Sequence, residues 1–180
     1  MSNLKMIAIV LKPVQIAMLV IGMGFVAYHT KEFRDELTKD DPKIDPYDVG
    51  ALGRYEFYLY SAGVGVVLAV FGLVCVLMGL LEKKHGALPM SAVQAIWTLQ
   101  LLVSTGLVTK ILTTYEEEHE VRGRFTTVSV SQCDFWDKAE NRDYDYTCDQ
   151  LIAGAVCGFL AMVAFAVDTA ISFVSHTRAQ

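Results

Sequence analysis

Four long apolar stretches, separated by polar connections, dominate the pattern of the chain. Residues 57–81 and 86–109 contain no charged side chain, residues 6–29 contain only Lys12, and residues 150–176 contain only Asp168. A bilayer core about 30 Å thick is crossed by roughly 20 apolar residues in a helix, and apolar runs of about 18 or more are typical of spanning segments. The pattern therefore predicts an all-α membrane protein whose four transmembrane helices span about residues 6–29, 56–81, 87–111 and 150–175.

The composition agrees with a chain that lies mostly within the membrane. Hydrophobic residues make up 53% of the 180 residues, above the roughly 45–50% typical of soluble domains. The first apolar stretch is longer than the core of a signal peptide and has no small-residue cleavage site near its end, so we expect a retained helix. We expect residues 1–180 to form a single domain, a four-helix transmembrane bundle with a small, disulfide-closed and partly β extracellular region.

The cysteines indicate which side of the membrane each connection occupies. The long connections, about residues 30–55 and 112–149, contain more basic residues than the termini and the short connection together, so the basic residues do not settle the orientation. Cys133 and Cys148 lie in a hydrophilic connection, where cysteine pairs form disulfides in oxidising compartments. We therefore expect a Cys133–Cys148 disulfide, extracellular or lumenal long connections and cytoplasmic termini. The plasma membrane or a cell junction is the expected location, and a vesicle membrane is the alternative.

Small residues line one side of the expected second and fourth helices. Gly65 and Gly72 belong to a series of small residues at helical spacing, and Gly154 and Gly158 form a G-x-x-x-G pair. Small residues allow the close contacts that hold membrane helices together, because lipid removes the hydrophobic drive between them. We favour packing within the bundle; the alternative is that one of these faces contacts another membrane protein.

Lys12 and Asp168 are the charged residues inside the apolar stretches. Charges at membrane depth are costly and usually find a partner or reach an interface. Counted inward from the expected outer ends of the first and last helices, both residues fall at a similar depth near the cytoplasmic face. This predicts an intramembrane ion pair; the alternative is that Lys12 extends to the headgroups and Asp168 is hydrogen-bonded locally. The middle of the membrane is free of charge, which disfavours an ion or proton pathway.

The sequence predicts local structure in the long connections and a belt of aromatic residues at the outer ends of the helices. Residues 31–37 could form a short amphipathic helix, and the β-branched residues of 124–131 predict a strand, paired with part of the first connection or within a small hairpin. Aromatic residues near the outer boundary are expected to form a belt among the lipid headgroups: Tyr28, Tyr55, Phe57, Tyr58 and Tyr60.

The segment CDFWDKAENRDYDYTC, residues 133–148, combines cysteines, aromatic rings and carboxylates. It contains no C-x-x-C pair, no histidine pair at ligand spacing and no calcium-loop pattern, so we expect neither a metal nor a cofactor. We interpret it as a disulfide-closed loop pinned just before the last helix. Two uses of its rings remain open, namely packing against the first connection or lipid, and contact with a partner; the rings are those of Phe135, Trp136, Tyr144 and Tyr146.

Catalytic and nucleic-acid-binding patterns are missing from the sequence. We find no nucleotide-binding loop, no nucleophile beside a base and no paired catalytic carboxylates, and the net charge is −5 with negative long connections. We therefore expect a non-enzymatic membrane protein with no small-molecule substrate. Its expected partners are membrane lipids and other integral membrane proteins, or further copies of itself.

The first and last helices carry a family resemblance. The first long connection lacks the Trp–Cys–Cys signature of claudins, and the second lacks the Cys-Cys-Gly of tetraspanins. VLKPVQIAMLVIGMGFVA, residues 10–27, and CDQLIAGAVCGFLAMVAFAVDT, residues 148–169, resemble the first and last helices of the MARVEL family. The Asp-Thr ending is also similar to that of the small four-helix proteins of arthropod smooth septate junctions. The resemblance implies a membrane-organising role at junctions or in trafficking; the alternative is an auxiliary subunit bound laterally to a channel, receptor or transporter.

Overall fold

The computed structural model is an all-α membrane protein with four helices of membrane-spanning length. It describes residues 3–40, 45, 47, 50, 52–79, 87–117, 119–122, 127–137 and 147–178. Within them, α1, α2, α3 and α5 each contain a stretch long and apolar enough to cross a membrane. The elements in chain order are α1 (Asn3–Asp40), α2 (Leu52–Leu77), α3 (Ala87–Glu116), β1 (His119–Arg122), β2 (Thr127–Val130), α4 (Gln132–Asp137) and α5 (Cys148–Arg178).

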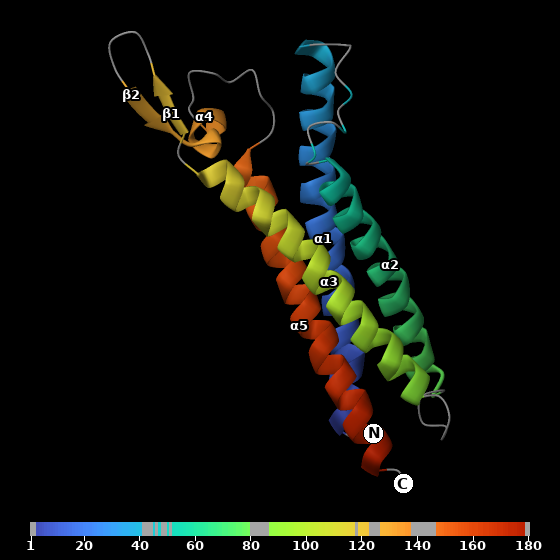
Figure 1. Cartoon of the computed structure of the whole chain (residues 1–180). Coiled ribbons are helices and arrows are strands. Elements are labelled where there is room, and N and C mark those ends of the chain that lie inside the picture. The colour runs from blue at the N-terminus through green and yellow to red at the C-terminus, as the bar shows by residue number, and fades with distance from the viewer. Residues whose placement is uncertain are drawn as a thin grey trace.

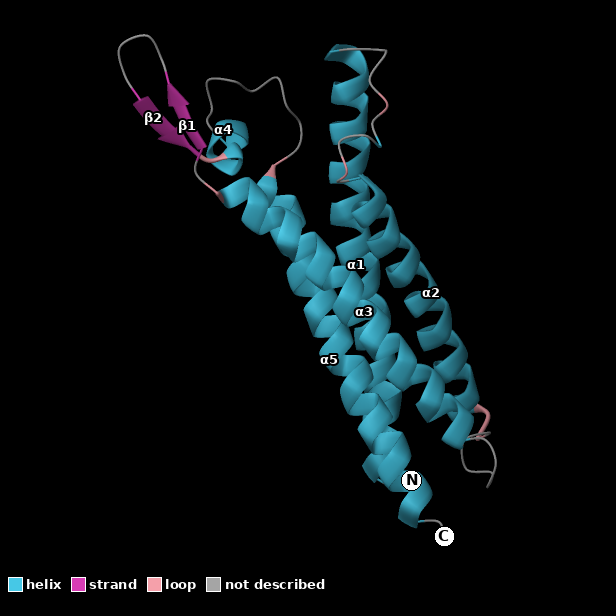
Figure 2. Ribbon diagram, viewed as in Figure 1, coloured by secondary structure: helices cyan, strands magenta, loops and turns pink. Residues whose placement is uncertain are grey.

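The four long helices form an up-and-down bundle that opens toward one end. α1 packs against α2 and α5, while α3 packs against α5 and α2. The beginning of α1 and the end of α5 lie at the same end, which we call the inner end (Figure 1). At the opposite, outer end, the α3–α5 pair diverges from the α1–α2 pair, and the hairpin and α4 lie beyond α3 and α5 (Figure 2).

α1 is longer than the apolar stretch that predicts it. It does not end near residue 29 but continues to Asp40, and its 38 residues extend about 57 Å, almost twice the thickness of a bilayer core. Phe33 is buried and Leu37 packs against the same core, so one face of the extension remains apolar. A Lys39–Glu36 ion pair of 3.2 Å lies on its polar side. The predicted amphipathic helix at 31–37 is therefore a continuation of α1.

The other long helices also extend past their apolar runs at the outer end. α2 begins at Leu52 where about 56 was expected, and α3 ends at Glu116 where about 111 was expected. α5 spans Cys148–Arg178, compared with the expected 150–175. The apolar run corresponds to the part of each helix that lies in the hydrocarbon core. Beyond it, the backbone hydrogen bonds continue into water for as long as the residues have sufficient helix propensity.

The second long connection contains an antiparallel hairpin followed by the short helix α4. His119 pairs with Val130 and Arg122 with Thr127, so the strand expected at 124–131 appears as β2 and pairs with β1. The Ser131 Oγ accepts a 3.0 Å hydrogen bond from the backbone N–H of Asp134, which caps the first turn of α4. Since α4 packs against α3 and α5, the hairpin leads directly into a docked segment.

The buried face of α2 follows a strict helical spacing. Its members recur every three or four residues, apart from two adjacent pairs, and turn one side of α2 toward the other helices: Leu52, Tyr55, Tyr58, Ser61, Ala62, Gly65, Ala69, Gly72, Cys75 and Val76. The Trp97 Nε1–H donates to the Ser61 carbonyl at 3.1 Å and the Gln100 Nε2–H to the Ser61 Oγ at 3.2 Å. These bonds join α2 to α3 at membrane depth, where side-chain hydrogen bonds hold helices together.

Large apolar side chains face outward on every long helix. Exposed examples are Ile21 on α1, Phe71 on α2, Leu99 on α3 and Val163 on α5. In water such a surface would be unfavourable, but in a bilayer it faces acyl chains of equal polarity. The exposed surface of the bundle is therefore a lipid-facing surface.

Candidate functional site

The four glycines predicted to support helix packing each face another helix of this chain. A Cβ on Gly154 would lie 2.5 Å from Cγ2 of Val26 on α1, and one on Gly158 would lie 2.6 Å from Oγ1 of Thr105 on α3. Gly65 and Gly72 also have neighbours on both α1 and α3, at 3.0 Å from such a Cβ for Gly65 and at 2.7–2.8 Å for Gly72. These glycines make the helix crossings possible, and none of the four is placed where a second protein would meet it.

Near the inner end, the structure brings Lys12 of α1 and Asp168 of α5 together. The Nζ of Lys12 lies 2.5 Å from Oδ2 of Asp168, and their side chains are 1% and 2% exposed. Gln15 lies one turn along α1, and its Nε2–H donates to Oδ2 of Asp168 at 3.3 Å and to the carbonyl of Ala164 at 3.1 Å. The carboxylate thus has a charged and a neutral partner, both supplied by α1.

The Lys12 side chain is buried between α1, α5 and α2, and Met90 of α3 lies against the same glycine of α2, Gly72. Its Nζ lies 5.8 Å from the centre of the Phe165 ring on α5, a cation–π distance. On α2, a Cβ at Gly72 would come within 2.8 Å of Nζ and within 2.7 Å of Cε of Met90, which belongs to α3. Gly72 therefore provides the space that the ammonium group occupies. A lone charge at membrane depth costs about 2.5–3.5 kcal/mol on insertion scales, so the pair holds its helices together.

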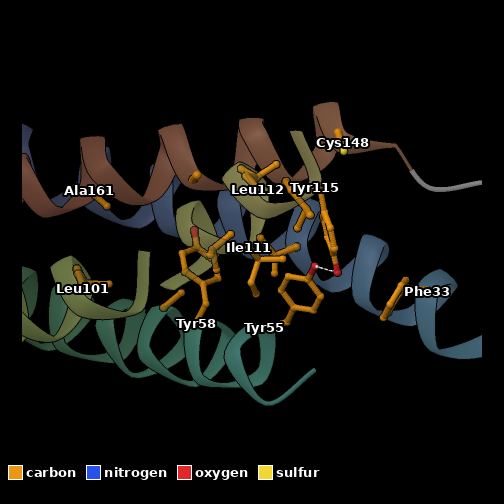
Figure 3. Close-up of a cluster of buried hydrophobic side chains, with 14 of the residues drawn as sticks. Phe33, Tyr55, Tyr58, Leu101, Ile111, Leu112, Tyr115, Cys148 and Ala161 are labelled. Atoms are coloured by element: carbon orange, nitrogen blue, oxygen red, sulfur yellow. Dashed lines mark hydrogen bonds between the residues drawn. The ribbon is translucent and has the colours of Figure 1, made fainter. Parts of the chain in front are cut away.

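At the outer end, aromatic rings fill the space between the diverging helix pairs. His29 and Phe33 of α1 stack at 6.1 Å, and the Tyr55 ring of α2 meets His29 edge-on at 5.6 Å. The Tyr55 OH donates to the Tyr115 OH of α3 at 3.3 Å, as Figure 3 shows. Trp136 of α4 completes this set, which we call the outer aromatic cluster. Large rings at the open end and glycines at the crossings together account for the shape of the bundle.

The disulfide predicted from the sequence is confirmed, and it holds α4 against the bundle. Cys133 in α4 and Cys148 at the start of α5 are bonded, with 5.5 Å between their Cα atoms. Trp136, one turn after Cys133, is 7% exposed; its ring lies 5.1 Å from that of Tyr115 and 6.2 Å from that of His29. His29 also contacts the backbone of Thr147, the residue before Cys148. His29 of α1 therefore contacts a residue near each end of the disulfide-closed loop, Trp136 near Cys133 and Thr147 beside Cys148.

Of the four rings proposed as partner contacts, Trp136 packs inside the protein. Its indole fills a space between α1 and α3, so the partner-contact hypothesis does not fit this residue. The side chain of Phe135 and all of Tyr144 and Tyr146 lie outside the described residues. Internal packing is thus the use found for the one ring that the structure describes.

Two members of the expected aromatic belt lie in the core instead. Tyr55 and Tyr58 are fully buried, whereas Tyr28 and Tyr60 are 46% and 62% exposed. The Tyr58 OH donates to the carbonyl of Gly154 at 2.9 Å, across the bundle from α2 to α5. The signal that separates these tyrosines was present in the sequence, because positions 55 and 58 continue the small-residue face of α2 at helical spacing.

Among the described residues of the connection between α1 and α2, Tyr47 contacts the outer end of α2. The Tyr47 OH donates to Oε1 of Glu56 at 2.7 Å, which ties this connection to the first turns of α2. The hydrogen bond to the Glu56 carboxylate raises the pKa of Tyr47, because it favours the protonated phenol.

Comparison with known proteins supports the same architecture. No curated protein and no solved structure matches the chain. The family model for MARVEL, described as a membrane-associating domain, matches residues 4–171, a range that includes α2 and α3, most of α1 and α5, the ion pair and the disulfide. The chain therefore belongs to the MARVEL family of membrane-associating domains.

Proposed function

We propose that this protein is a non-enzymatic organiser of membrane contacts or assemblies that acts through its helices and outer connections. One observation carries the proposal: the buried charged, aromatic and glycine residues contact other helices of the same chain. The buried charges, the outer aromatic cluster and the close glycines all join helices of the same chain. What faces outward on the described helices is an apolar belt, and this is the surface with which we expect the protein to meet lipids and neighbouring membrane proteins.

The proposal places the outer connections outside the cell or in a lumen, and both termini in the cytoplasm. The Cys133–Cys148 disulfide supports this orientation, because such bonds persist in oxidising compartments. The resemblance of the last helix to septate-junction proteins favours a plasma membrane or cell junction. In this location the acidic second connection, held by α4, would face the neighbouring cell or a partner in the same membrane.

A second candidate is an auxiliary subunit that binds laterally to a channel, receptor or transporter. The exposed apolar faces of the long helices favour it, because a partner helix can replace lipid there. The two candidates predict different companions in the native membrane.

Purification from native membranes in a gentle detergent, followed by quantitative mass spectrometry, separates them. A carboxy-terminal tag allows capture, and an unrelated four-helix membrane protein with the same tag is the control. We expect enrichment of junction or membrane-organising proteins, or of further copies of the chain. A channel or transporter at a constant stoichiometric ratio would instead establish the auxiliary-subunit function.

A further inference from the structure

The Lys12–Asp168 pair joins the first spanning helix to the last. α1 is synthesised before α2 and α3, and α5 enters the membrane after them, because chains emerge from the amino terminus. Until α5 has packed against α1, Lys12 lacks the carboxylate that lies beside it in the finished bundle. The pair is therefore complete only when the last helix is in place.

The other helices offer Lys12 no substitute in the described part of the chain. Within residues 52–79 and 87–117, the carboxylates are those of Glu56, Glu116 and Glu117, all near the outer ends of α2 and α3. Lys12 lies near the inner end of α1, a membrane thickness away. A bundle of α1, α2 and α3 alone thus holds an ammonium group at membrane depth without a counter-ion among these residues.

In the finished bundle, α2 and α3 enclose the Lys12 side chain without providing a counter-ion among the described residues. Gly72 of α2 lies against the Lys12 side chain, and Met90 of α3 lies against the same glycine. These contacts enclose the ammonium before α5 supplies Asp168 and the Phe165 ring. Burial without a partner disfavours a charge, whereas a complete pair removes the penalty.

We propose that the Lys12–Asp168 pair is an assembly checkpoint. A chain in which α5 has not docked on α1 presents an unpaired charge at membrane depth, is held by a membrane-embedded quality-control protein with polar groups of its own, and does not leave the endoplasmic reticulum. A chain in which the helices have docked conceals both charges and is exported. The signal is the unpaired charge, and no particular sequence around it is needed. This proposal does not depend on the junction function.

The test compares single and paired substitutions in the full-length, carboxy-terminally tagged chain expressed in cells. The single variants Lys12→Met and Asp168→Leu each leave one buried charge unpaired. The double variant Lys12→Met with Asp168→Leu removes both charges, and the exchange Lys12→Asp with Asp168→Lys restores a pair in the opposite sense. Lys110→Met removes an exposed charge from α3 and is the matched control. The measurement is the fraction of tagged chain that coincides with a marker of the endoplasmic reticulum.

We expect each single variant to be retained several-fold more than the unsubstituted chain. The double variant, the exchange and Lys110→Met should leave the endoplasmic reticulum as the unsubstituted chain does. Normal export of both single variants would overturn the proposal. It would equally be overturned if the double variant and the exchange were retained as strongly as the single variants. Export would then depend on the identity of these two side chains and not on whether a charge is unpaired.

Discussion

At the scale of single residues, the crossing of α1 and α5 depends on the missing side chain of Gly154. A Cβ there would lie 2.5 Å from Cγ2 of Val26, far closer than two carbon atoms can approach. Gly24, on the same α1 helix, has nothing within 4 Å of the equivalent position and faces outward. The two glycines are therefore a matched pair, one enclosed and one open.

We predict that Gly154→Ala destabilises the protein by about 1–3 kcal/mol, the usual effect of overpacking a core. Gly24→Ala should have no destabilising effect. Unfolding of the purified protein in detergent, followed by circular dichroism with increasing denaturant, provides the measurement. Adding Val26→Ala to Gly154→Ala should recover part of the loss, because it removes the atom that the new methyl group meets. Equal stability of Gly154→Ala and Gly24→Ala would contradict the close crossing.

Trp136 packs inside the protein, which is one of the two uses that the sequence left open for its ring. Its ring lies among Tyr115 and His29 rather than on the surface. We predict that Trp136→Ala lowers the free energy of unfolding by about 3–5 kcal/mol, as loss of a buried large ring does. Trp136→Phe should cost less, and Tyr60→Ala, at an exposed ring on α2, should cost little. If Trp136→Ala abolished partner capture while leaving the unfolding curve unchanged, the ring would be a contact surface after all.

At the scale of elements, α1 and α5 are joined by an ion pair that neither helix can satisfy alone. Removing one partner from a buried pair usually costs about 3–5 kcal/mol, whereas replacing both with apolar residues is often neutral. We predict that Lys12→Met and Asp168→Leu each lower the stability of the protein. The double variant should lose far less stability than the two single losses added together. A double-mutant cycle on thermal unfolding in detergent measures the coupling. Additive losses would show that the two side chains act independently.

Helix ends illustrate what the sequence could and could not predict. The uncharged stretches locate the four spans well, because the bilayer demands about 20 apolar residues whatever the fold. They do not locate the end of α1, because Phe33 and Leu37 continue its buried face among charged residues that favour water. The sequence predicts an amphipathic helix at 31–37, but its continuity with the first helix follows from the packing of Phe33 against His29 and Tyr55.

Some residues of the candidate site can be predicted from the sequence, whereas others are found only in the structure. Lys12 and Asp168 stand out in the sequence because few charges occur in apolar stretches, and depth alone suggests that they meet. The role of Gln15 follows only from geometry, since its amide must be one turn from Lys12 and opposite Asp168. The outer aromatic cluster could not be predicted, because its rings come from four different elements and an interfacial belt draws on the same residue types.

At the scale of the whole molecule, orientation is the property on which function depends most. Asp143→Thr completes a glycosylation acceptor at Asn141 in the second long connection, and Lys83→Asn with His85→Ser creates one in the short connection. We predict that the first acceptor is glycosylated in cells and the second is not, judged by the shift in gel mobility that a glycosidase reverses. The opposite result would place the termini in the lumen or outside the cell.

The bundle is joined near its inner end by the ion pair and at its outer end by the outer aromatic cluster with the disulfide. Hydrogen bonds from Tyr58 and Trp97 join the helices between these two ends. Such a bundle presents its outer segments from a fixed base and its flanks to lipid. This is the arrangement on which the proposed organising function depends.

The most direct measurement is the distribution of the tagged protein in a sheet of contacting cells in which only some cells express it. If the protein organises membrane contacts, its density should be higher where two expressing cells touch than on free membrane. The Trp136→Ala variant, which loosens α4, should lose that enrichment in proportion to its loss of folded protein. A uniform density on contacting and free membrane, together with constant co-purification of a channel, would contradict the organising function.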